Sequence, residues 1–185
     1  MRWLYLVTPL FFTACACVGP MQGSNAGVNS EPTYERAAQS KLIQANHRAA
    51  DSLLTQGQPS LEPFKPILTA TFVSIDNLNQ SSRLGRVISE HVASRFTQRG
   101  VPVIEMKMRG TIFVDSGQGE LLLSREVQDI SQSHKAQAVI VGTYARAERY
   151  VYVTAKLVRS VDNTILAAYD YVLPLDSNVS SMLTR

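Results

Sequence analysis

The sequence predicts an α/β fold, a single-domain sandwich with a mixed sheet. The chain has 185 residues, 45% of them apolar, which is enough for one domain with a core. A β-rich run, a helical pattern and a second β-rich run follow one another between 67 and 106, and such a crossover joins parallel strands. Three more strand patterns between 136 and 174 are separated by short turns, which favours an antiparallel meander.

The first 17 residues have the pattern of an exported lipoprotein. Arg2 precedes an apolar run at 3–12, the order found in secretory signal peptides. This run is too short to cross a bilayer, which takes about 20 apolar residues. Small residues and two cysteines follow. We therefore expect a signal peptide at 1–14 and lipid on Cys15, with Cys17 as the alternative.

Two segments precede the core. Residues 15–32 are rich in Gly, Ser, Asn, Pro and Gln, which predicts a flexible tether between the lipid and the domain. Residues 33–57 are expected to form an amino-terminal helix that ends near Gly57. Its apolar residues recur at helical spacing, namely Leu42, Ala45, Ala49, Ala50 and Leu53.

The first half of the core reads as strand, helix, strand. Residues 67–75 are β-rich, and the polar stretch 77–82 can cap a helix that ends at Gly100. A second strand is expected at 101–106. The buried face of the helix is predicted from Leu84, Val87, Ile88, Val92 and Phe96.

The second half of the core begins after a predicted loop at 109–120. Ser124 is expected to cap a short helix whose apolar face carries Val127 and Ile130. The meander strands are then expected at 136–144, 150–159 and 165–173. Within the middle strand, the residues predicted to face the helices are Val151, Val153, Ala155 and Leu157.

Several short segments carry a resemblance to a known family. They read Ser-Ser-Arg-Leu-Gly-Arg at 81–86, Gly-Glu-Leu-Leu-Leu-Ser-Arg at 119–125 and Ala-Val-Ile-Val-Gly-Thr-Tyr at 138–144. With Val-Tyr-Val at 151–153 and Ala-Ala-Tyr-Asp-Tyr at 167–171, they resemble the FlgO family of outer-membrane flagellar assembly proteins. The resemblance implies a FlgO-like α/β domain at 67–176, a part in building or stabilising a flagellum, and no catalytic role.

The residues themselves give no sign of catalysis or of a cofactor. His47, His91 and His134 lie on different predicted helices, with no cysteine or carboxylate at metal-ligand spacing. No Gly-x-Ser-x-Gly elbow surrounds a serine. The net charge of +3 is scattered along the chain, which argues against nucleic acid as a partner. We expect neither an enzyme nor a bound cofactor or metal.

Four residues are candidates for a protein interface. Arg83 and Arg86 begin the long helix, and arginine supplies forked donors suited to interfaces. Tyr150 and Tyr152 lie in the tyrosine-rich meander, and interfaces favour tyrosine. The alternative is a solvated helix face for the arginines and core positions for some of the tyrosines.

The expected function follows from the leader and the resemblance. We expect a non-enzymatic structural or assembly component around the flagellar basal body, needed for motility. It would be lipid-anchored at the periplasmic face of the outer membrane. Its partners would be basal-body or outer-membrane ring proteins and possible further copies of itself. The alternative is a periplasmic lipoprotein adaptor that recruits or activates a cell-wall or secretion enzyme.

Lipidation of Cys15 is the first testable prediction. Acyl chains supply about 0.8 kcal/mol per buried methylene, so two or three chains hold a protein stably at a membrane. Ala16 follows the cysteine, and in the sorting rule known from enteric bacteria a residue other than Asp there implies the outer membrane. Mass spectrometry of the mature amino-terminal peptide should show the lipid on Cys15. An unmodified Cys15 would contradict the prediction.

Overall fold

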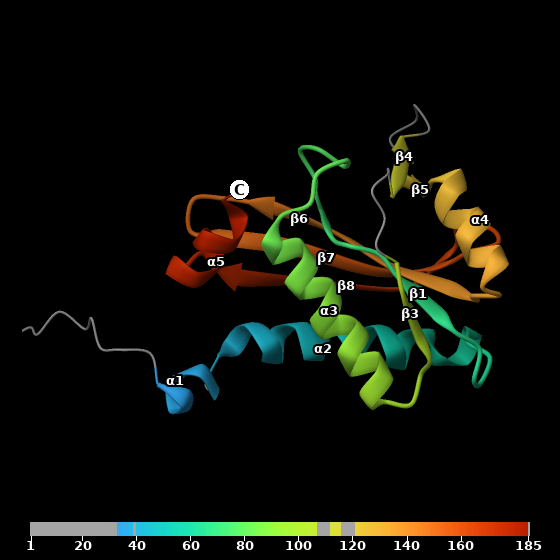
Figure 1. Cartoon of the computed structure of the whole chain (residues 1–185), viewed down its shortest axis with the longest axis horizontal. Coiled ribbons are helices and arrows are strands. Elements are labelled where there is room, and N and C mark those ends of the chain that lie inside the picture. Colours follow the sequence, from blue (N-terminus) through green and yellow to red (C-terminus); the bar gives the residue numbers. More distant parts are fainter. Residues whose placement is uncertain (1–32, 39, 107–111, 116–120, 185) are drawn as a thin grey trace, which may run out of the picture.

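The computed structural model describes residues 33–38, 40–106, 112–115 and 121–184. The predicted signal peptide at 1–14, the tether at 15–32 and both cysteines lie outside the described residues. Figure 1 shows the described part as a long sheet with helices packed along it. None of the helices described has the length and apolarity needed to cross a bilayer.

A mixed sheet forms the centre of the fold. Its strands run in the order β3-β1-β6-β7-β8, and β2 pairs with β6 beside this path. β1 lies parallel to both β3 and β6, whereas β6, β7 and β8 form the antiparallel meander. This arrangement confirms the predicted α/β fold class. The strands are β1 (Ile67–Thr69), β2 (Val73–Ser74), β3 (Val103–Glu105), β6 (Ala138–Arg146), β7 (Tyr150–Arg159) and β8 (Ile165–Pro174).

The helices lie on both faces of this sheet. In Figure 1, α2 and α3 cross in contact with each other, α5 lies near the start of α3, and α4 lies at the other end of the molecule. Ser82 and Ser124 cap α3 and α4 as predicted, each accepting a bond from a first-turn N–H. The helices are α1 (Tyr34–Ala38), α2 (Lys41–Gly57), α3 (Arg83–Gln98), α4 (Arg125–Ser133) and α5 (Ser177–Leu183), with a 3₁₀ turn η1 (Gln58–Ser60).

Alternation along the strands divides the core in two. Ile140 and Val153 are buried with residues of α2 and α3 on one face of the sheet. Val139 and Val141 point to the other face and are buried with Val127 of α4. The predicted inward row of β7 is confirmed, because Val151, Val153, Ala155 and Leu157 are all fully buried.

Local structure differs from the predicted pattern at several places. The expected helix at 33–57 is divided into α1 and α2. The expected strand at 67–75 is divided into β1 and β2, because the chain between them places the Phe72 ring over Gly142. Within the expected loop at 109–120, residues Phe113–Asp115 form a strand, β4, instead. It pairs antiparallel with a second unpredicted strand, β5 (Leu121–Leu123). Helix α5, capped by Asp176, was not predicted.

A charged cluster fixes α2 against α3. Asp51 Oδ1 accepts hydrogen bonds from Arg95 Nε at 3.0 Å and Arg99 Nε at 2.8 Å, and Oδ2 accepts one from Arg95 Nη2 at 2.9 Å. Hydrogen bonding to Arg95 is the largest cause, and hydrogen bonding to Arg99 the next, of a lowered pKa of the Asp51 carboxyl, which falls from 3.8 to about 2. Because a forked guanidinium meets both carboxylate oxygens, this cluster sets the register between the two helices.

A buried amide joins the same two helices to β8. Asn46 of α2 is fully buried, and its Oδ1 accepts a 2.7 Å bond from the Tyr171 hydroxyl. Its Nδ2 lies 3.0 Å from Nδ1 of His91 in α3 and donates to it when the ring is neutral. Burial is the main cause of a lowered pKa of His91, and repulsion from the neighbouring His47 is the second. The lowered pKa favours the neutral ring. Helix α2 is thus tied to both α3 and the sheet.

The two faces of the meander predict opposite responses to the same substitution. Val153 of β7 is 1% exposed, so Val153→Asp buries a carboxylate without a partner and should lower the free energy of unfolding by about 3 kcal/mol or more. Val172 of β8 points to the other face and is 49% exposed, so Val172→Asp should cost less than about 1 kcal/mol. Thermal melting of the two variants checks this. Equal losses would show that the assignment of the faces is wrong.

Candidate functional site

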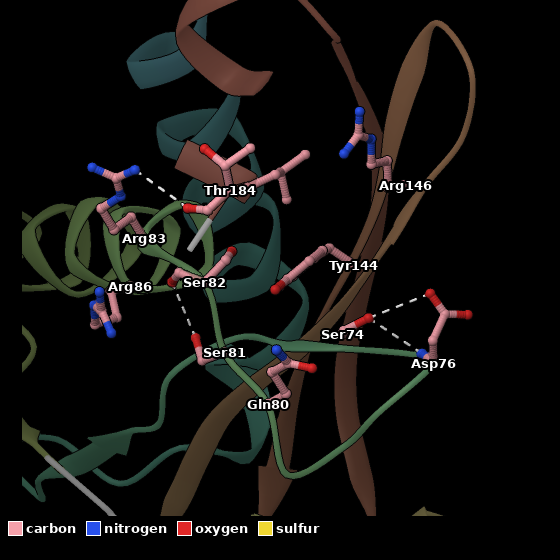
Figure 2. Close-up of a pocket in the computed structure, with 11 residues that line it drawn as sticks. Ser74, Asp76, Gln80, Ser81, Ser82, Arg83, Arg86, Tyr144, Arg146 and Thr184 are labelled. Atoms are coloured by element: carbon pink, nitrogen blue, oxygen red, sulfur yellow. Dashed lines mark hydrogen bonds between the residues drawn. The ribbon is translucent and has the colours of Figure 1, made fainter. Parts of the chain in front are cut away.

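A cleft of about 580 Å³ lies where the first turn of α3 meets the end of β6. The loop after β2 forms its floor, and the end of α5 closes one side (Figure 2). Its lining is mostly polar and charged. The lining residues are Ser74, Asp76, Gln80, Ser81, Ser82, Arg83, Arg86, Tyr144, Arg146, Leu183 and Thr184.

Two glycines and one phenylalanine place α3 beside β6. A Cβ on Gly142 of β6 would collide with the Phe72 ring, so only glycine lets that ring lie on the strand. A Cβ on Gly85 of α3 would collide with the Phe72 carbonyl oxygen. Ser81 Oγ donates a 2.8 Å hydrogen bond to the same carbonyl. The first turn of α3 is therefore held against the sheet, and the cleft opens beside it.

Three arginines line the cleft and differ in how they are held. Arg83 donates from Nη2 to the carbonyl oxygens of Ser181 at 2.8 Å and Thr184 at 3.2 Å, which fastens the end of α5. The guanidinium groups of Arg86 and Arg146 have no hydrogen-bond or ion-pair partner among the described residues. Figure 2 shows Arg83 and Arg86 on the α3 wall and Arg146 on the facing wall.

Tyr144 adds a hydroxyl group to this charged cleft. Its side chain belongs to β6, the residue is 5% exposed, and its ring packs in the main core. Figure 2 shows the hydroxyl pointing from β6 toward the start of α3. Within the described part of the chain this hydroxyl has no hydrogen-bond partner. A donor thus faces the cleft beside the arginines.

One carboxylate also borders the cleft. Asp76 lies in the loop after β2, and its backbone N–H donates to Ser74 Oγ at 3.3 Å. The same Ser74 hydroxyl lies 3.5 Å from Asp76 Oδ2. The lining charges are therefore three guanidinium groups and one carboxylate, which leaves the cleft positive.

The four interface residues predicted from the sequence do not form one surface. Arg83 and Arg86 line the cleft, on the face of the sheet that carries α2 and α3. Tyr150 and Tyr152 point to the other face, where they are 49% and 55% exposed. There they lie opposite Pro174 and Val172 of β8 in the strand register.

Sequence reasoning missed Arg146 and Tyr144 as site residues. Their alternation with Gly142 along β6 places all three on one face, and the sequence pattern contains that signal. What it does not contain is the distance from β6 to the first turn of α3, which depends on the contact between Phe72 and the glycines.

No group of three or more potential metal ligands occurs in the part of the chain that the structure describes. The rings of His47 and His91 do lie close, with centroids 6.4 Å apart. His91 is occupied by Asn46, however. The pair joins two helices of the core, and neither histidine lines the cleft.

Comparisons with known proteins agree on family and fold. A family model described as FlgO protein matches residues 47–178. The LpoB C-terminal domain from Salmonella enterica matches with a TM-score of 0.50 at 10% identity, over 72% of this chain and 98% of that domain. The same domain from Escherichia coli matches with a TM-score of 0.50 at 7% identity, over the same shares. At such identities the likeness shows the fold alone. Curated protein sequences gave no match.

The close contact at Gly85 predicts that a side chain larger than hydrogen at this position would disturb the cleft. Gly85→Ala places Cβ against the Phe72 carbonyl oxygen and Ser81 Oγ, and neither can move without shifting the helix start. We expect a loss of about 1–3 kcal/mol in the free energy of unfolding despite the better helix propensity of alanine. Ser94→Ala, at an exposed position of the same helix, should change it by less than about 0.5 kcal/mol. Denaturant unfolding compares the two, and an unchanged Gly85→Ala variant would contradict the packing argument.

Proposed function

The chain belongs to the FlgO family, and from this we propose that it is a non-enzymatic component of flagellar assembly that works through protein contacts at the outer membrane. The family match covers residues 47–178, from within α2 to the beginning of α5, so it includes all the described strands. In this proposal the protein is needed for motility and acts around the basal body. Lipid on Cys15 and the tether at 15–32 hold it at the periplasmic face of the membrane.

The chemistry of the cleft is the single observation that carries a binding role. Its described lining residues include no histidine, cysteine or lysine, and the Asp76 carboxylate lies 3.5 Å from the Ser74 hydroxyl within one loop. What the cleft offers is hydrogen-bond donors and positive charge, held in place by the packing of α3 on the sheet. Such a surface is suited to recognising a partner, which supports the proposed binding role.

The partners in this proposal are basal-body or outer-membrane ring proteins. Arg86 offers an exposed guanidinium on the α3 wall of the cleft. Tyr150 and Tyr152 offer a second exposed surface on the opposite face of the sheet. Two contact surfaces on opposite faces of one domain suit a subunit that joins neighbours, including further copies of itself.

A motility test uses Arg86 because its guanidinium group makes no hydrogen bond or ion pair with the described residues. Arg83 is less suitable, since its reversal also releases the end of α5. Deletion of the gene should impair swimming in soft agar while growth stays normal, and purified basal bodies should contain the wild-type protein. Arg86→Glu should accumulate normally but restore little swimming, because it reverses charge at the contact surface without touching the core.

The matched control is Arg125→Glu, at the exposed first residue of α4 on the other side of the sheet. It should restore swimming fully, and immunoblots should show equal amounts of both variants. If the deletion strain swims normally while its cell wall becomes fragile, the flagellar role is wrong. The alternative, a periplasmic adaptor for a cell-wall or secretion enzyme, then takes its place.

A further inference from the structure

We propose that the cleft at the start of α3 binds an acidic peptide segment of a partner protein. The inference rests on the proposed binding role and names the chemistry of the partner. Three guanidinium groups and one carboxylate line the cleft, so an anionic chain is attracted to it. Guanidinium forks match the two oxygens of a carboxylate, which makes arginine well suited to bind acidic side chains.

The spread of the arginines favours a chain over a single ion. Arg86 and Arg146 stand on facing walls of the cleft rather than converging on one point (Figure 2). Neither guanidinium group has a hydrogen-bond or ion-pair partner among the described residues, so both are available to a ligand. A segment with carboxylates at intervals can place one beside each of these arginines.

The Tyr144 hydroxyl can donate a hydrogen bond to an occupant of the cleft. The ring of this residue packs in the core, which holds the hydroxyl in place, and the hydroxyl makes no hydrogen bond within the described residues. Its O–H faces the space beside α3 (Figure 2). A carboxylate or peptide carbonyl oxygen in the cleft would accept its hydrogen bond, and the positive end of the α3 dipole would add to the attraction.

The remaining lining argues for a peptide rather than a phosphate or a lipid surface. Asp76 would repel a phosphate dianion more strongly than a monoanionic carboxylate, and its oxygens can accept hydrogen bonds from peptide N–H groups. Leu183 and the Tyr144 ring supply apolar contact for the chain between its charges. The volume of about 580 Å³ lies within the range of ligand pockets. A flat membrane surface cannot reach a hydroxyl recessed between α3 and β6.

Binding of a defined peptide tests the proposal. The probe is a fluorescein-labelled peptide of alternating Glu and Ser with three Glu, and its neutral counterpart carries Gln in place of Glu. The full chain, purified in detergent, should bind the Glu peptide, and binding should weaken with added salt. The Gln peptide should bind at least about tenfold more weakly.

Variants locate the binding within the cleft. Arg86→Gln and Arg146→Gln should each weaken binding of the Glu peptide about tenfold, and Tyr144→Phe about threefold. Arg125→Gln removes the same charge from α4, outside the cleft, and should bind as the wild-type chain does. Circular dichroism melting shows whether each variant is folded. Only folded variants enter the comparison, and the two single arginine changes on different walls provide independent readings.

Any one of four results would overturn the proposal. Equal binding of the Glu and Gln peptides would show that charge is not recognised, and an equal loss in Arg125→Gln would show that binding is non-specific. Saturation by inorganic phosphate at lower concentrations than by the peptide, or binding only to phosphatidylglycerol vesicles, would assign the cleft to phosphate or lipid. Because the assay does not involve motility, its failure leaves the flagellar role standing, and normal swimming of a deletion strain leaves this binding result standing.

Discussion

The close approach of Phe72 to two glycines is the constraint on which the rest of the structure depends. Its ring lies on Gly142 of the central strand β6, and its carbonyl oxygen lies against Gly85 in the first turn of α3. Ser81 adds a hydrogen bond to that carbonyl. Since a methyl group at either glycine would separate helix from sheet, this contact fixes where α3 begins. The Asp51 cluster with Arg95 and Arg99 then fixes α3 against α2.

The position of α3 also creates the cleft. Once its first turn is held against the sheet, Arg83 reaches the last carbonyl oxygens of α5 and Arg86 is left facing the cleft. Arg146 and Tyr144 lie on the facing wall because they alternate with Gly142 along one face of β6. The close packing of Phe72 on Gly85 and Gly142 therefore supports the arginine-lined cleft and holds its walls in place.

The sheet separates two surfaces with different chemistry. The cleft offers guanidinium groups and a hydroxyl on the face that carries α2 and α3. The exposed face of β7 and β8 offers the aromatic rings of Tyr150 and Tyr152. One surface suits an acidic partner and the other suits apolar packing, so the two can be occupied at the same time. This division is consistent with a subunit that links neighbours in an assembly.

The sequence alone determined the fold class, the meander with its buried row on β7 and the serine caps of α3 and α4, because each depends on residues near one another in the chain. Family resemblance was visible in the same way, in the short segments around Gly85 and Gly142. Tertiary structure alone decided the break between β1 and β2, the helix α5 and the cleft. These depend on Phe72 meeting residues 13 and 70 positions away in the chain, and on Arg83 reaching Ser181. The periodicity of apolar residues predicts which face of an element is buried, but it does not predict which residue from a distant part of the chain packs against that face.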